Sequence, residues 1–133
     1  MSMGSGLSAL HAKRRRLRAW VKERAEASAE ERGRWHLELG ILEKLLGGPS
    51  GIEPAFAHLR RALELLPASA RRARQRALFV LGLTHGDVLE PQAAVERFQG
   101  VVAEDQDSTL AKAARGYAET YREHFGLEGA QPG

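Results

Sequence analysis

The stretch Ala77–Phe98, ALFVLGLTHGDVLEPQAAVERF, constrains the fold more than any other part of the sequence. Leu78 and the residues that follow place apolar groups on one face of a helix, and Gly82 allows a second helix to approach closely. A polar turn then interrupts the pattern, after which Ala94 and Phe98 form a small–large pair on another helix. The stretch therefore predicts a helical hairpin whose apolar faces need neighbours.

Composition favours the same structure along the whole chain. Of the 133 residues, 43% are hydrophobic and 28% charged, with many Ala, Leu, Glu and Arg, which favours a single all-α domain. The absence of cysteine excludes disulfides and thiolate sites. The longest apolar run, Ala77–Leu83, is far shorter than the roughly 20 residues that span a bilayer, and no signal peptide is evident, so we expect a cytoplasmic protein. The opening MSMGSG resembles a vector-derived leader, which leaves open a native leader or membrane segment before it.

Apolar periodicity and helix punctuation predict about six helices. The capping box Ser28-x-x-Glu31 starts the second helix, and the sequence GGPSG ends it in a loop. Ser69 is a candidate cap for the fourth helix, Asp107 or Ser108 for the sixth, and Gly126 marks the end of the sixth. The predicted organisation is a flexible segment 1–6, a basic amphipathic helix 7–27, a helical domain 28–126 and a disordered tail 127–133.

Glycines recur at corresponding places in the chain. Gly82 and Gly116 are 34 residues apart, each in the middle of a predicted helix, and Gly40 follows a leucine as Gly82 does. The partner helices agree too, since Ala55-x-x-x-Leu59 parallels Ala94-x-x-x-Phe98. Over roughly residues 32–125 the chain resembles the tetratricopeptide repeat family, a helix–turn–helix repeat of 34 residues. The resemblance implies a right-handed stack of antiparallel helix hairpins.

In that family the first helices of the pairs line a concave groove that receives a peptide or a helix of another protein. Leu37 and Ile41 stand where the carboxylate-clamp version of the family has polar groups, which argues against capture of a C-terminal carboxylate. Three covers for so apolar a groove stay open: the chain's own first helix, a second copy of the chain, or a foreign amphipathic helix. The resemblance places these residues at the groove: Leu37, Ile41, Leu45, Phe79, Leu83, Tyr117 and Tyr121, with Arg34 and Arg76 near one edge.

A basic segment in the first predicted helix indicates a rival function. Clustered cations neutralise the phosphates of nucleic acid or hold an anionic membrane surface. Glutamates follow closely, and Trp20 is the single aromatic residue among them, so a solvated helix face is the other interpretation. The basic patch comprises Lys13, Arg14, Arg15, Arg16, Arg18 and Lys22.

The sequence carries no recognisable catalytic motif. The five histidines include no pair three or four residues apart, and no HExxH motif occurs. The GGPSG loop lacks the Lys-Ser/Thr of a phosphate loop. We therefore expect a non-catalytic adaptor, scaffold or chaperone-like module without metal or cofactor, which binds a partner helix or peptide or associates with itself.

Overall fold

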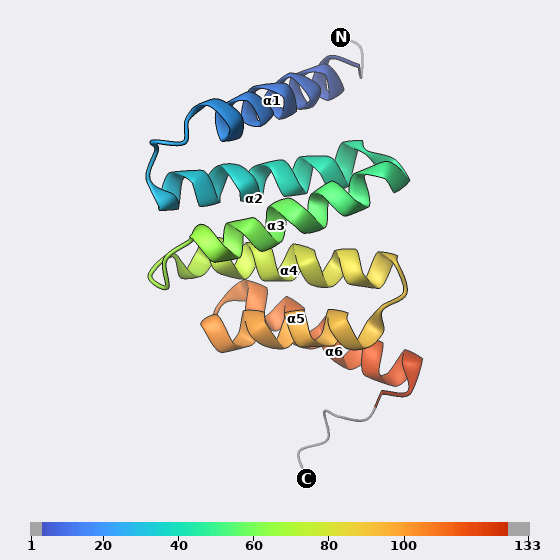
Figure 1. Cartoon of the computed structure of the whole chain (residues 1–133). Coiled ribbons are helices and arrows are strands. Elements are labelled where there is room, and N and C mark those ends of the chain that lie inside the picture. The colour runs from blue at the N-terminus through green and yellow to red at the C-terminus, as the bar shows by residue number, and fades with distance from the viewer. Residues whose placement is uncertain (1–3, 128–133) are drawn as a thin grey trace. The chain divides into compact units, whose positions relative to one another are not determined.

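The computed structural model describes residues 4–127, and this part of the chain is helical throughout, without a strand (Figure 1). Its α-helices confirm the all-α class. A 3₁₀ turn, η1 (Gly48–Gly51), occupies the GGPSG loop. The helices are α1 (Gly4–Glu23), α2 (Ala29–Leu46), α3 (Ile52–Leu65), α4 (Arg71–Asp87), α5 (Pro91–Glu104) and α6 (Thr109–Phe125).

The chain divides into two compact units, the first ending at Pro67 and the second beginning at Ala68. The sequence instead suggested a separate first helix followed by one domain. The difference arises because α1 buries Leu17 against Leu39 and Leu42 of α2, with Trp20 and Trp35 packed beside them. In the first unit α1 and α3 both pack on α2, and in the second α5 packs on α4 and α6.

Local capping signals account for most helix ends. Ser28 Oγ accepts a hydrogen bond from Glu31 N at 3.1 Å, and Ser108 Oγ accepts one from Ala111 N at 2.9 Å, so α2 and α6 begin as predicted. Gly126 ends α6 in the left-handed region, with φ of 62°. Ser69 was the wrong cap, because α4 follows Ala70 without any side-chain cap.

The ends of α1 differ from the prediction. The helix begins at Gly4 and ends at Glu23, so residues 4–6 are helical rather than flexible, and residues 24–27 form a turn. The predicted disordered tail lies outside the described residues from residue 128 onwards, as do residues 1–3 at the start.

The repeated glycines do not all have the same role. A Cβ on Gly40 would lie 2.7 Å from Leu59 Cγ, and one on Gly82 would lie 2.7 Å from Phe98 Cε1. At both places only a hydrogen fits, so the helices of each hairpin cross closely. Gly116 is exposed, and a Cβ there would meet nothing within 4 Å. The 34-residue spacing to Gly116 therefore carries no equivalent packing.

A buried amide fixes the turn between α5 and α6 in the second unit. The side chain of Gln75 is within hydrogen-bond distance of Val101 O (2.9 Å), Asp105 O (3.0 Å) and Ser108 Oγ (2.9 Å) through Nε2. Gln75 is 3% exposed, so these contacts satisfy backbone carbonyls that water cannot reach. They hold the start of α6 against α4.

Candidate functional site

Three of the predicted groove residues meet in an aromatic cluster of the second unit. The ring centroids of Phe79 and Tyr117 are 5.6 Å apart, and those of Tyr117 and Tyr121 are 6.4 Å apart. Phe98 joins them from α5, with its ring stacked 5.4 Å from that of Tyr117. Tyr117 is 42% exposed, so the cluster reaches the surface. It is named the aromatic cluster below; Leu83, on the same helix as Phe79, is half-buried.

The other predicted groove residues are less uniform. Leu37 is 1% exposed, which leaves it no surface to offer a partner, whereas Leu45 is 65% exposed and Ile41 is half-buried. Arg34 donates to Glu30 at 2.9 Å within its own helix. Arg76 is exposed on α4.

The first helix does not cover the Ile41 and Leu45 face of α2. It packs on the face that carries Trp35, Leu39 and Leu42. At 100° per residue Ile41 and Leu45 lie on a different side of α2 from these three. Of the three covers that the sequence allowed, the structure of the first unit does not support the chain's own first helix.

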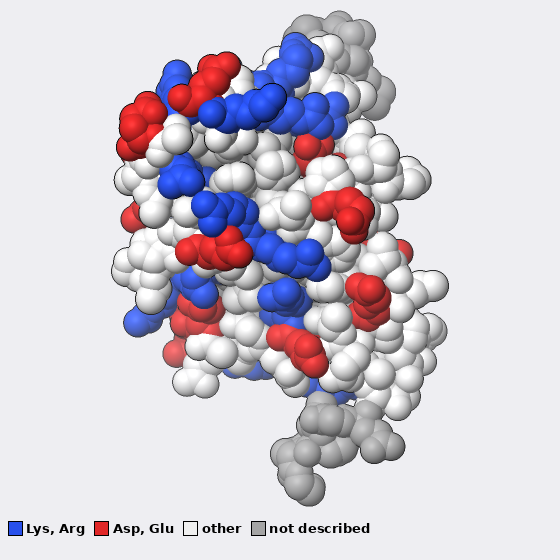
Figure 2. Space-filling view, viewed as in Figure 1, with Lys and Arg blue, Asp and Glu red and all other residues white. Residues whose placement is uncertain are grey.

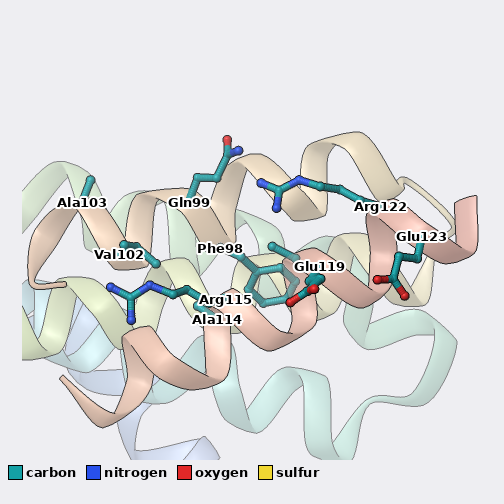
Figure 3. Close-up of a pocket in the computed structure, with 10 residues that line it drawn as sticks. Phe98, Gln99, Val102, Ala103, Ala114, Arg115, Glu119, Arg122 and Glu123 are labelled. Atoms are coloured by element: carbon teal, nitrogen blue, oxygen red, sulfur yellow. The ribbon is translucent and has the colours of Figure 1, made fainter. Parts of the chain in front are cut away.

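A groove that the sequence did not predict runs between α5 and α6 (Figure 3). Its volume is about 670 Å³. Phe98, Val102, Ala114 and Ala118 form its apolar floor, and the two alanines lie one helical turn apart on α6. The rim consists of Gln99, Ala103, Arg115, Glu119, Arg122 and Glu123. We call it the α5–α6 groove; its only signal in the sequence is the alternation of small and charged residues along α6.

The rim of the α5–α6 groove carries both signs of charge on α6, and Figure 3 shows the two guanidinium groups and the two carboxylates beside the floor. Arg115 Nη2 donates to Gln106 O at 2.7 Å. Arg122 Nε is buried, and no acceptor among the described residues lies within hydrogen-bond distance of it. An unsatisfied buried donor costs about 1–3 kcal/mol. This atom therefore favours any partner that brings an acceptor to the rim.

The basic patch divides into two sets. Lys13 pairs with Glu38 at 3.2 Å, and Arg14 and Arg18 pair with Glu43 at 3.4 and 2.8 Å. These three hold α1 to α2 and serve the fold. Figure 2 shows Lys and Arg gathered over α1. The exposed remainder of the patch is Arg15, Arg16 and Lys22.

Two histidines from different helices of the first unit lie in contact. His36 Nδ1 on α2 is 2.9 Å from His58 Nδ1 on α3, and the ring centroids are 5.1 Å apart. Burial lowers the pKa of His36 to about 4, and His58, Arg61 and Arg32 lower it further. Burial also lowers the pKa of His58, where Arg18 acts in the same direction and Glu43 opposes it. The 22 residues between them hid the pair from a search for local ligand spacing.

Acid should destabilise the first unit through this pair. Because the pKa of His36 falls from 6.5 to about 4 on folding, the unfolded chain binds more protons between these values. The stability is therefore complete above about pH 6.5 and is lost as the pH falls towards 4. We expect a loss of about 1–2 kcal/mol, since the half-exposed rings are partly screened. Urea titrations at several pH values, for the wild type and for His36→Gln/His58→Gln, measure it; identical pH profiles for the two proteins would contradict the expectation.

None of the helices in the described part of the chain has the length and hydrophobicity that crossing a bilayer requires. Within residues 4–127, no three or more His, Cys, Asp or Glu side chains gather in a way that suits a metal ion. Comparison with protein-family models, with curated proteins and with solved structures finds no match to this chain.

Proposed function

We propose that this chain is a non-catalytic protein-interaction module, built of helix hairpins like tetratricopeptide repeats, that receives an amphipathic helix of another protein. The observation that carries the proposal is the α5–α6 groove, with its apolar floor between two antiparallel helices. The aromatic cluster lies on the other side of α6 from Arg115 and Glu119, and Phe98 contributes to both surfaces. No cofactor takes part in this function.

The dimensions and side chains of the groove suit a helix. Packed helices lie 8–10 Å apart, and small side chains at the contact allow the closest approach. Ala114 and Ala118 provide such a surface on α6, and Val102 faces them from α5. A third helix lying along these residues would cover apolar side chains with apolar side chains, as helices do in a bundle.

Charge at the rim selects the partner. Arg115 and Arg122 are separated by two helical turns, with Glu119 between them. A partner helix with an acidic residue opposite Arg122 would satisfy its buried Nε, and a basic residue one turn away would face Glu119. The expected partner sequence thus combines an apolar stripe with alternating charges on its flanks. These rim charges would set its direction and register more than its affinity.

Two exposed alanines allow a matched test. Ala103 lines the α5–α6 groove, and Ala113 lines a hollow of about 370 Å³ beside Tyr117 and Tyr121. We expect Ala103→Trp to weaken binding at least about tenfold, because its indole would fill the groove, and Ala113→Trp to leave it within about twofold. The measurement is fluorescence anisotropy with a helical peptide selected against the wild type from a display library. Far-UV circular dichroism confirms that both variants fold.

The reverse pattern would move the binding site to the aromatic cluster, and loss in neither variant would contradict a helix-binding role for both surfaces. Sedimentation separates the remaining case. If the wild type forms a dimer that Ala103→Trp dissociates, the helix in the groove comes from a second copy of this chain.

A further inference from the structure

We propose that His36 and His58 form a bidentate site for a late first-row divalent cation, with Cu²⁺ bound most tightly. The observation behind it is the 2.9 Å separation of their Nδ1 atoms across α2 and α3. This inference is independent of the proposed function, since it concerns the first unit and a different chemistry.

The separation of the two nitrogens suits chelation. Metal–imidazole bonds measure about 2.0–2.1 Å, so two of them at a right angle place the nitrogens about 2.9 Å apart. A right angle is the angle between neighbouring ligands in the square-planar and tetragonal geometries of Cu²⁺ and Ni²⁺. A tetrahedral Zn²⁺ would need the nitrogens roughly 3.3 Å apart, which requires a small movement of one ring. The geometry therefore favours Cu²⁺ over Zn²⁺, as the general affinity order does.

Binding needs no net release of a proton. In the hydrogen-bonded pair one Nδ1 carries a hydrogen and the other accepts it. If that hydrogen moves to Nε2 of the same ring, both Nδ1 lone pairs become available to the ion. Both imidazoles remain neutral, and neutral imidazole is the form that ligates metals.

The charges around the pair set its affinity. Arg32 and Arg61 act on His36, and Arg18 and Glu43 act on His58. Because burial and these arginines hold the pKa of His36 at about 4, protons do not compete with the metal at neutral pH. The described residues supply no third His, Cys, Asp or Glu ligand, and water would complete the coordination shell of the half-buried site. Two protein ligands make an exchangeable site rather than a structural one.

Titration of the full chain with CuCl₂, followed by electron paramagnetic resonance, tests the proposal. We expect one equivalent to give a tetragonal spectrum with splitting from two imidazole nitrogens in the wild type. His36→Gln and His58→Gln should each abolish that signal, while the control His124→Gln, on an exposed residue of α6, should retain it. An unchanged spectrum in the folded His36→Gln and His58→Gln variants would overturn the proposal.

A measurement on the wild type alone guards against variants that fail to fold. At one tenth of an equivalent of Cu²⁺, paramagnetic broadening in the NMR spectrum should erase the ring signals of His36 and His58 before those of the other three histidines. Earlier broadening of His11, His85 or His124 would overturn the site.

Discussion

Replacement of Phe98 by alanine is expected to lower the free energy of unfolding of the second unit by about 3–5 kcal/mol. Phe98 is 0% exposed, and its ring lies 5.6 Å from that of Phe79, 5.4 Å from that of Tyr117 and 5.8 Å from that of Tyr121. The substitution removes a phenyl group around which the helices cannot fully close. It also removes three aromatic contacts, each of which contributes about 0.5–1.5 kcal/mol beyond burial.

Urea denaturation followed by circular dichroism measures this loss. The matched control is Phe125→Ala, at the end of the same cluster, where the ring is 41% exposed and touches Tyr121 at a centroid distance of 6.0 Å. We expect the control to cost less than about 1.5 kcal/mol, because little of the ring is taken out of water. Equal losses in the two variants would show that Phe98 does not organise the unit.

The place of Phe98 illustrates how far the sequence predicts this fold. Its pairing with Gly82 was predictable, since a small residue on one helix and a large one on the next are typical of a close crossing. Ser28 and Gly126 were predictable for a similar reason: a cap acts within a few residues of itself. Ser69 failed as a cap because the chain enters α4 one residue later, a choice made by packing rather than by propensity.

The candidate sites were much less accessible to sequence analysis. The α5–α6 groove exists because two helices meet at an angle that leaves Ala114 and Ala118 between them, and no local pattern fixes that angle. His36 and His58 meet because α2 and α3 cross near Gly40, where a Cβ would collide with Leu59. In the sequence both histidines are isolated polar residues in amphipathic helices. Only tertiary contact gives them a shared chemistry.

Glu43 is the clearest case of a residue that the sequence conceals. It stands in α2 among several glutamates, and its position favours a solvated helix face. The structure instead buries its side chain to 4% exposure, between Arg14, which is 17% exposed, and Arg18, which is 49% exposed. Arg18 contacts both carboxylate oxygens, at 2.8 and 2.9 Å through Nη2. Two basic-patch residues are therefore internal partners of a buried acid.

Replacement of Glu43 by alanine is accordingly expected to lower the free energy of unfolding of the first unit by about 2–4 kcal/mol. Loss of one partner of a fully buried ion pair costs about 3–5 kcal/mol, because the remaining charge stays desolvated. Here the lower figure applies to the half-exposed Arg18, which can turn into water, whereas Arg14 keeps its buried Nε and loses its carboxylate. We expect α1 to detach from α2 before the α2–α3 hairpin unfolds, and urea titration with near-ultraviolet detection at Trp20 and Trp35 follows that step.

Glu38→Ala is the matched control, because it breaks the other ion pair between the same two helices. Lys13 and Glu38 are 45% and 34% exposed, so solvent screens their 3.2 Å contact, and we expect a change below about 1 kcal/mol. Burial, rather than the number of ion pairs, would then decide how firmly α1 is held. A Glu38→Ala loss as large as that of Glu43→Ala would contradict this account. So would a stable Glu43→Ala protein, since it would show that α1 is held by Leu17 and its apolar neighbours alone.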